Sequence, residues 1–256
     1  MTDLVSIIMP SFQTGDCLDS TIRSVLAQSY ENWELIIVDD ASTDETDKVV
    51  EGFLSDPRIR YFKNENNCGA ALSRNRALRE ARGRWIAFLD SDDLWLPEKL
   101  EKQIAFMEKK GCAFSYTDYQ ILSPSGEMLP YIFTAPNRIN KTKMYCYCYF
   151  STITVMYDAN VVGLIQIPDI KKNNDYAMWL KAVEKTDCYR LPLCLSIYRK
   201  REGSISSGSK IKLIRYHYIL FRETLGKSKF TAFFLTGVNL FFGVLRKLFY
   251  KKKIKG

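Results

Sequence analysis

The chain has 256 residues, of which 46% are apolar and 13% aromatic. This length is enough for one large α/β domain with a substantial core, and the apolar and aromatic content is too high for a disordered chain. Its net charge of +8 is concentrated at one end, because residues 210–256 carry 12 Lys and Arg against one Glu, which leaves −3 for residues 1–209. A protein that binds nucleic acid would carry basic residues on its folded body, so the composition argues against nucleic acid as a partner and indicates a basic appendage.

The cysteine and histidine content argues against two further kinds of protein. The seven cysteines contain no C-x-x-C pair and the only histidine is His217, so neither a zinc site nor a secreted disulfide framework is predicted. The first residues, MTDLVSIIMPSF, show no basic segment followed by an apolar stretch and a cleavage site. We therefore predict no signal peptide and expect the protein on the cytoplasmic side of the membrane.

Short apolar runs alternate with helical periodicity over the first hundred residues. Strands are predicted at 5–9, 34–40, 58–63 and 84–89, and helices at 18–26, 42–54, 69–83 and from Pro97 onwards. The helix at 42–54 opens with capping residues, and the helix at 69–83 is closed by a glycine. This alternation predicts an α/β fold with a Rossmann-like, mostly parallel sheet that has helices on both faces.

The pattern after residue 112 is less regular. We predict a hairpin at 123–126, a strand at 151–157, a helix at 175–186 and an extended segment at 188–201. No internal repeat or low-complexity linker is present in this part of the sequence.

Polar residues follow three of the predicted strands. Pro10 and Ser11 follow the first strand, Asp39 and Asp40 end the second, and the sequence from 90 to 93 ends the fourth. Because ligands of parallel sheets bind beyond the carboxyl ends of the strands, we expect these residues at one edge. The segment 90–93 holds three carboxylates, and two such charges about 4 Å apart repel by about 4 kcal/mol at an effective dielectric near 20. We therefore expect a positive partner beside them.

Five segments of the chain resemble, in order, the successive sequence blocks of glycosyltransferase family 2. They are VSIIMPSF, LIIVDDASTDET, NCGAALSRNRAL, GRWIAFLDSDDLWLPEKLEKQ and NNDYAMWL. The resemblance is dense over residues 4–107 and thinner to about residue 206. It implies an inverting sugar transferase with the GT-A fold, in which residues 1–209 form the catalytic domain. Residues 1–110 would be its nucleotide-binding half and 111–209 its acceptor-binding half.

Asp90 and Asp92 form a D-x-D motif. Carboxylate oxygens suit hard cations such as Mn²⁺ or Mg²⁺, which take their remaining ligands from a diphosphate and water. The resemblance implies that Asp92 contacts the metal, that Asp90 faces the metal or the ribose of the sugar nucleotide, that Ser91 belongs to the donor site and that Asp93 is structural. The alternative is that Asp92 or Asp93 caps the helix that starts near Pro97.

The resemblance also implies a nucleotide pocket at the ends of the first two strands. Asp40 would bind the base, since a carboxylate can accept the ring N–H of uracil, and the backbone of Pro10, Ser11 and Phe12 would line the same pocket. Asp39 is a further candidate for nucleotide binding. A helix cap for the segment that follows is the alternative for both aspartates.

Arg74 and Asn75 match the R-N pair of the family. Arg74 would bind phosphate or uridine oxygens with paired hydrogen bonds, on a helix whose start is small enough for a ligand to approach closely. The same helix carries three other arginines, so a solvated basic face is the alternative.

The resemblance makes Asp175 the base that removes the proton of the acceptor hydroxyl, with helix capping as the alternative. Asn174, Trp179 and Arg201 are candidates for contacts with the acceptor or the diphosphate. The family often has an acidic residue at the position of Asn174 and a histidine at that of Arg201. Since arginine stays protonated, Arg201 is a poor metal ligand but could contact the diphosphate.

The tail combines an apolar segment with a cationic end. The 16 residues from 230 to 245 are interrupted by Thr236, Gly237 and Asn239 and are short for a membrane span of about 20 residues. We predict an amphipathic helix that binds the inner membrane surface through residues 230–256, with its lysines drawn to anionic headgroups. A helix packed on the body with a solvated lysine end is the alternative.

These features together predict a metal-dependent, inverting glycosyltransferase that transfers a hexose from a UDP-sugar to a saccharide acceptor on a polyprenyl diphosphate, for a bacterial surface polysaccharide. One rival is a sugar-1-phosphate nucleotidyltransferase, which would need a glycine-rich phosphate loop where PSFQTGDC contains only Gly15. The other is a noncatalytic module that binds lipid or nucleic acid. The sequence does not predict the donor sugar, the acceptor or the oligomeric state.

Overall fold

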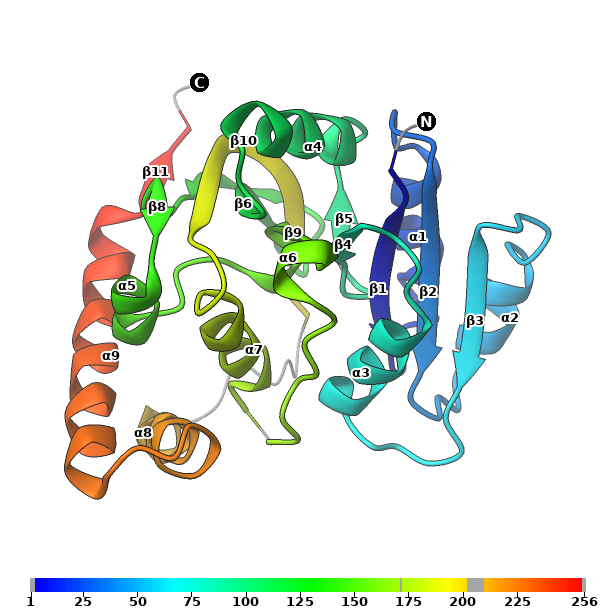
Figure 1. The fold of residues 1–256 in the computed structure, drawn as a ribbon. Helices are drawn as coiled ribbons and strands as arrows, with labels where there is room; N and C mark the ends of the chain where they lie inside the picture. Colours follow the sequence, from blue (N-terminus) through cyan, green and yellow to red (C-terminus); the bar gives the residue numbers. More distant parts are fainter. Residues whose placement is uncertain (1–2, 171, 202–209, 255–256) are drawn as a thin grey trace.

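A computed structural model describes residues 3–170, 172–201 and 210–254 of the chain (Figure 1). The predicted boundary between body and tail, at residue 209, lies outside the described residues. So does most of the segment 198–206 that resembles the family. An eleven-stranded sheet runs through the described part, with the main order β11-β7-β6-β9-β4-β1-β2-β3 and with β10 pairing β5, β6 and β8.

The strands and helices alternate through the N-terminal half, as expected. The strands are β1 (Val5–Ser11), β2 (Trp33–Asp39), β3 (Ile59–Lys63), β4 (Trp85–Phe88), β5 (Leu94–Trp95), β6 (Phe114–Leu122), β7 (Met128–Phe133), β8 (Arg138–Ile139), β9 (Val155–Asp158), β10 (Cys188–Arg199) and β11 (Lys251–Lys253). The helices are α1 (Leu18–Leu26), α2 (Thr46–Glu51), α3 (Ala70–Glu80), α4 (Lys99–Lys110), α5 (Lys141–Cys146), α6 (Ala159–Val162), α7 (Asn174–Ala182), α8 (Lys210–Ile219) and α9 (Lys229–Phe249).

The sheet is parallel in its N-terminal half and mixed in the rest. Strands β3, β2, β1 and β4 are all parallel, as predicted. Beyond them β9 runs antiparallel to both β4 and β6, and β7 forms the expected hairpin with β6. Strand β10 returns parallel to β6. The expectation of a mostly parallel sheet therefore holds only for the N-terminal half, because short connections such as the 123–126 turn require antiparallel neighbours.

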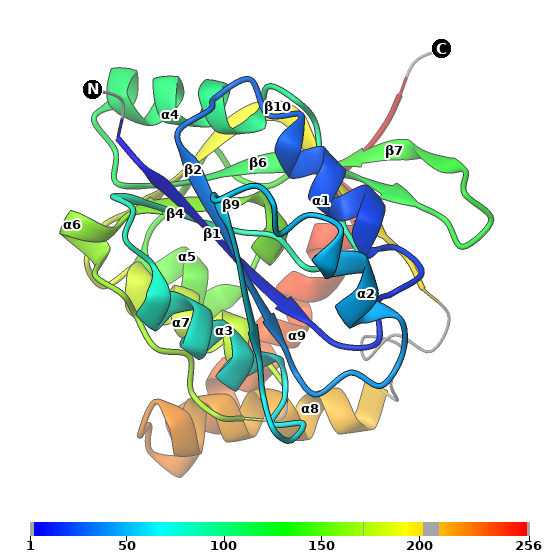
Figure 2. The same cartoon turned by 90° about the vertical axis from the view of Figure 1, so that its right-hand side faces the viewer.

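Strand β1 lies between two hydrophobic clusters that cover the two faces of the sheet. Ile8 belongs to one cluster, with residues of α3 and α7, whereas Ile7 and Met9 belong to the other, with residues of α1 and α4. Alternate side chains of a strand point to opposite faces, so this buried strand supplies both. Figure 2 shows α1 and α4 on one side of β1 and β2, and α3 and α7 on the other.

Several predicted boundaries are wrong, among them the end of the helix expected at 175–186, since α7 ends at Ala182. The helix expected at 42–54 is only α2, which begins at Thr46, and the strand expected at 151–157 is a 3-10 turn at Thr152–Thr154 followed by β9. Helix α3 ends at Glu80 and is not closed by a glycine cap. Gly83 instead sits directly against β1, where a Cβ atom would lie 2.6 Å from the Leu4 carbonyl oxygen.

The close packing of Gly83 gives a prediction for stability. In Gly83→Ala the added methyl group would meet backbone that cannot move freely, so we expect a loss of about 1–3 kcal/mol and a fall in Tm of about 2–4 °C for each kcal/mol, measured by thermal unfolding. The control is Gly237→Ala in α9, where nothing lies within 4 Å of the new Cβ. The control should keep or raise the Tm, and an unchanged Tm for Gly83→Ala would contradict the close packing.

Candidate active site

Arg74 on α3 lies among the carboxylates that follow β4. Its Nη2 donates to Oδ1 of Asp90 at 2.5 Å, and its Nε is buried without a hydrogen-bond partner among the described residues. Burial by itself would lower the pKa of Arg74, but the charges of Asp90, Asp175 and Asp92 raise it. The structure thus brings three predicted site residues, from two distant parts of the sequence, around one guanidinium.

Asp92 and Asp93 differ in burial and in their partners. Burial and the charge of Asp90 raise the pKa of Asp92 to about 6, against the opposing charges of Arg201 and Arg199. Asp93 is fully buried, and its Oδ1 accepts a hydrogen bond from the backbone N–H of Arg199 at 2.7 Å. No side chain caps α4, so the capping alternative for Asp92 and Asp93 is wrong.

The carboxylates fit a hard divalent cation that is shared with a diphosphate. A cation at Asp92 would relieve the repulsion from Asp90 that raises its pKa. Among the residues that the structure describes, no group of three or more His, Cys, Asp and Glu side chains could hold a metal by itself. Mg²⁺ in proteins is usually bound by one or two carboxylates, and substrate phosphate and water complete the coordination.

Asp40 binds the start of α3 in this structure. Its carboxylate accepts hydrogen bonds from the backbone N–H groups of Cys68 and Gly69 and from the side chains of Asn64 and Ser73, at 2.7–3.0 Å. Burial raises the pKa of this carboxyl, but the hydrogen bonds outweigh burial and lower it overall. In the described part of the chain its Oδ2 accepts one hydrogen bond, from Gly69, so this oxygen has a further lone pair for a donor. Base binding by Asp40 stays a prediction.

One turn of α3 connects the two acidic strand ends. Ser73 binds Asp40 after β2, and the next residue, Arg74, binds Asp90 after β4. The two carboxylates are therefore held by adjacent residues of the same helix. This places the predicted base-binding and metal-binding groups on one rim of the sheet.

Asp39 closes the turn after β2 and does not cap α2. It is fully buried, and its carboxylate accepts hydrogen bonds from the backbone N–H and the hydroxyl of Ser42. Helix α2 begins only at Thr46, so the capping alternative is wrong for this residue. The structure gives Asp39 a turn-forming contact, and nucleotide binding by it stays a prediction.

The C-terminal end of β1, which includes Pro10 and Ser11, lies beside Asp40. The carbonyl oxygen of Ser11 accepts the backbone N–H of Asp40 at 2.8 Å. Pro10 and Ser11 are buried, whereas Phe12 is 46% exposed. That their backbone lines a nucleoside pocket next to Asp40 stays a prediction. Ser91 is also buried, and its carbonyl accepts the hydroxyl of Thr21 at 3.0 Å.

Asp175 lies in the first turn of α7. Its Oδ2 accepts the hydroxyl of Thr152 at 3.0 Å and its Oδ1 accepts the N–H of Tyr176 at 2.8 Å. Asn174 Oδ1 accepts the N–H of Asp175 itself at 2.7 Å, so the neutral side chain at this position still helps to hold the candidate base. Nothing in the sequence pointed to Thr152, which is far from Asp175 along the chain.

Two predicted site residues do not reach the rim. Trp179 is fully buried and packs edge-on against Phe88 with ring centroids 5.2 Å apart, so its predicted contact with the acceptor or the diphosphate is wrong. Asn75 is buried, and its amide exchanges two hydrogen bonds with the backbone of Ile167, at 2.6 and 2.8 Å. Asn75 therefore fixes the loop before α7, and the structure does not bring it to the donor side.

Two arginines at the end of β10 extend the site. Arg201 Nη2 donates to the carbonyl of Gln13 and to Asp16, both at 3.2 Å, and the charges of Arg201 and Arg199 both act on Asp92. They line a cavity of about 650 Å³ with Asp16. Arg199 was not among the predicted site residues. Its position two residues before Arg201 could have indicated it, because residues two apart in an extended segment share a face. A diphosphate contact by Arg201 stays a prediction.

Comparisons with known proteins identify the family of the chain. The family profile described as Glycosyl transferase family 2 matches residues 6–156. A putative teichuronic acid biosynthesis glycosyltransferase of Bacillus subtilis is 41% identical over 222 residues, which cover 86% of this chain and 88% of that protein. A UDP-Glc:α-D-GlcNAc-diphosphoundecaprenol β-1,3-glucosyltransferase of Escherichia coli, WfgD, is 40% identical over 221 residues, 85% of each chain.

Solved structures of similar fold include TarS of S. aureus in complex with UDP-GlcNAc, with a TM-score of 0.72 and 21% identity over 90% of this chain and 69% of that chain. A mannosyltransferase of Pyrobaculum calidifontis in complex with GDP-Man and Mn²⁺ has a TM-score of 0.66 and 16% identity over 93% and 70% of the two chains. At these identities the likeness shows the fold alone. Together with the family match, it shows that the chain belongs to glycosyltransferase family 2 and is a glycosyltransferase with the GT-A fold.

Proposed function

We propose that this enzyme transfers a hexose from a UDP-sugar to a hydroxyl group of a lipid-linked saccharide, in the biosynthesis of a bacterial surface polysaccharide. The observation that carries the proposal is the environment of Arg74, where the candidate metal ligands Asp90 and Asp92 and the candidate base Asp175 act on one guanidinium. The name of the Escherichia coli relative WfgD, which specifies UDP-Glc and an acceptor linked to diphosphoundecaprenol, supports the classes of donor and acceptor.

The reaction would be a single in-line displacement. Asp175 is oriented by Thr152 and the N–H of Tyr176. It would take the proton of the acceptor hydroxyl while the oxygen of that hydroxyl attacks C1 of the donor sugar. A Mn²⁺ or Mg²⁺ ion bound by Asp92, with Asp90, would stabilise the charge of the departing diphosphate. One displacement on an α-linked donor inverts C1 and gives a β-glycosidic bond.

The predicted division of the body follows from the same assignment. Residues 1–110 would bind the nucleotide through Asp40, the backbone from Pro10 to Phe12 and the segment that contains Ser91. Residues 111–209 would supply the acceptor side through Asp175 and Asn174, with Arg201 beside the diphosphate. The support is that Asp40 and Asp90 are held by adjacent residues of α3, whereas Asp175 approaches from α7.

Helix α9 buries small or polar side chains and exposes large apolar ones, which supports attachment to a membrane. Its buried residues are the small or polar Ala232, Thr236 and Asn239. Many large apolar residues on it are strongly exposed: Phe230 (89%), Phe233 (76%), Phe234 (68%), Phe241 (60%), Val244 (60%), Leu248 (69%) and Phe249 (69%). A helix that faces water would show the opposite pattern, and an exposed apolar surface of this kind favours a membrane contact. The exposed lysines of β11 would each add about 1 kcal/mol on anionic lipid.

The structure favours a helix that lies in the membrane surface over one that spans it. Helix α9 has 21 residues and is long and apolar enough to cross a membrane by length and composition. However, it packs along α8 and α5, and its C-terminal end leads into β11, which pairs with β7 in the sheet. Since one face of α9 is held against the body, only its outer face is free to enter lipid.

The role of Asp175 can be tested by substitution. Asp175→Asn keeps the size of the side chain but cannot accept the proton, so we expect kcat to fall by about 10²–10⁴ with unchanged affinity for the UDP-sugar. The measurement is a screen of UDP-sugars for metal-dependent UDP release with lipid-diphosphate acceptors. Asp169→Asn, an exposed acid in the loop before α7, is the control. Transfer by Asp175→Asn at the unmodified rate would make another residue the base.

The metal proposal can be tested by substitution. Asp92→Asn should weaken the binding of Mn²⁺ or Mg²⁺ by about 10–100-fold and should slow UDP release by the same factor. Chelation of the metal should abolish UDP release by the wild type.

The metal proposal also predicts a dependence on pH. The pKa of Asp92 near 6 in the metal-free protein means that protons compete with the cation below this pH. The metal concentration for half-activation should thus rise about tenfold for each pH unit below about 6. Wild-type turnover without metal, or turnover of UTP with a sugar phosphate, would contradict the proposal.

The membrane contact can be measured with lipid vesicles. Replacing Phe233 and Phe234 together by Ser should weaken binding to phosphatidylglycerol vesicles by about tenfold or more for each ring, because a buried Phe contributes about 1.5–3 kcal/mol. Leu54→Ser, which changes an exposed apolar residue beyond α2, is the control and should bind as the wild type. A wild-type protein that stays wholly soluble during detergent-free fractionation would contradict the contact.

A further inference from the structure

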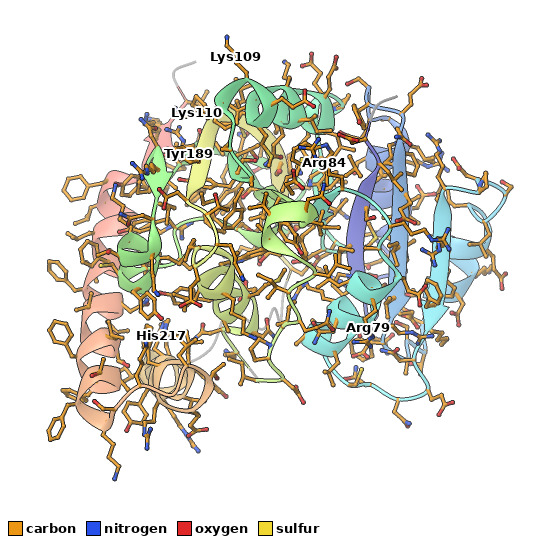
Figure 3. The ribbon with its side chains drawn as sticks, viewed as in Figure 1. Arg79, Arg84, Lys109, Lys110, Tyr189 and His217 are labelled. Atoms are coloured by element: carbon orange, nitrogen blue, oxygen red, sulfur yellow. The ribbon has the colours of Figure 1, made fainter. Side chains whose placement is uncertain are left out.

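A second cavity, of about 530 Å³, starts at Asp175 and extends between α7, α8 and α9. Figure 3 labels His217, which belongs to its lining and lies on α8 in the angle between α7 and α9. On the basis of the proposed function, we propose that this cavity binds the saccharide diphosphate group of the acceptor, and that the tail helix α9 supplies Asn239 to a sugar hydroxyl and Lys247 to a phosphate. The tail is then a wall of the acceptor site as well as a membrane contact.

Asn239 borders the cavity and has a buried hydrogen-bond acceptor without a partner. Its side chain is 0% exposed, and its Oδ1 has no hydrogen-bond partner among the described residues. The hydroxyl of Tyr176 donates to the carbonyl of Met144 at 2.5 Å and so accepts from Asn239 Nδ2, at 2.8 Å. This arrangement fixes which end of the amide is free. A buried carbonyl oxygen without a partner costs about 1–3 kcal/mol, and a sugar hydroxyl in the cavity would remove that cost.

Gly243 lets the ring of Tyr147 approach the backbone of α9. A Cβ atom at this position would lie 3.0 Å from Cε2 of Tyr147, and both residues line the cavity. A larger side chain at position 243 would therefore push the ring away or project into the space beside it. The width of the cavity depends on this contact between the tail and the segment before β9.

The charges of the cavity match a saccharide diphosphate. Burial lowers the pKa of His217 to about 4, so its ring is neutral at pH 7. Among the described residues of the lining, Asp175 and Lys247 are then the charged ones. The cavity thus offers a carboxylate where a hydroxyl must lose its proton and a cation for a phosphate.

The place of Lys247 on α9 explains how a lipid-linked acceptor could enter. Lys247 and Gly243 line the cavity, whereas Phe241 and Leu248, on the adjacent face of the same helix, are 60% and 69% exposed. A diphosphate beside Lys247 would therefore have its lipid chain next to the apolar face of α9. The acceptor would reach Asp175 without leaving the membrane surface.

The experiment compares Lys247→Gln with Lys229→Gln, which changes an exposed lysine at the other end of α9, outside the cavity. The acceptor is N-acetylglucosaminyl diphosphate esterified to a short alkyl alcohol, so that binding to lipid does not contribute. We expect Lys247→Gln to raise the acceptor KM about tenfold, with kcat and the donor KM unchanged, and Lys229→Gln to behave as the wild type. An unchanged acceptor KM in Lys247→Gln, or an equal rise in both variants, would overturn the proposal.

Gly243→Leu provides an independent test of the same cavity. It should raise the acceptor KM at least as much as Lys247→Gln, while calorimetry still detects normal UDP-sugar binding, which shows that the donor side is folded. A wild-type protein that binds no UDP-sugar would overturn the proposed function itself. Normal donor binding with an unchanged acceptor KM in either Gly243→Leu or Lys247→Gln would overturn only the assignment of the cavity.

Discussion

A buried guanidinium must be compensated by nearby negative charge, and Arg74 obtains this compensation where α3, the end of β4 and the start of α7 meet. The repulsion among the carboxylates after β4 and the burial of Arg74 would each be unfavourable alone. Together they stabilise one arrangement, in which Asp90 is bound and Asp175 lies within reach of the same charge. Because Ser73 binds Asp40 in the same turn of α3, the position of this one helix sets the spacing between the nucleoside side and the diphosphate side.

The grouping of acidic residues at the rim of the sheet could be predicted from the sequence. Parallel strands bring their carboxyl ends to one edge, and this does not depend on the conformation of the loops. This geometry is enough to place Asp40, Asp90 and Asp92 near one another. Asp175 was identified only through the family resemblance, since α7 follows an irregular region. Asn75 and Trp179 could not be placed, because the direction of a helical side chain is decided by its tertiary partner. For Asn75 that partner is Ile167, 92 residues away.

The C-terminal half was harder to predict for a related reason. The pairings of β9, β10 and β11 join segments that are distant in sequence, and local patterns carry no information about such contacts. Strand β11 consists of three lysines, which have low strand propensity, and pairing with β7 overrides that preference. The apolar segment of the tail was judged too short for a membrane span because Thr236, Gly237 and Asn239 interrupt it. In the structure Thr236 and Asn239 face inward, so they belong to the helix and mark its inner face.

Strand β11 also determines how the sheet ends. It covers the outer edge of β7, and all three of its lysines are exposed. An open edge strand offers unpaired backbone groups to a second molecule, and short, lysine-rich edges discourage such pairing because like charges repel. Removal of the tail to obtain a more tractable protein would therefore uncover β7 along Tyr131–Phe133. The shortened chain would exchange an apolar helix for an aggregation-prone edge.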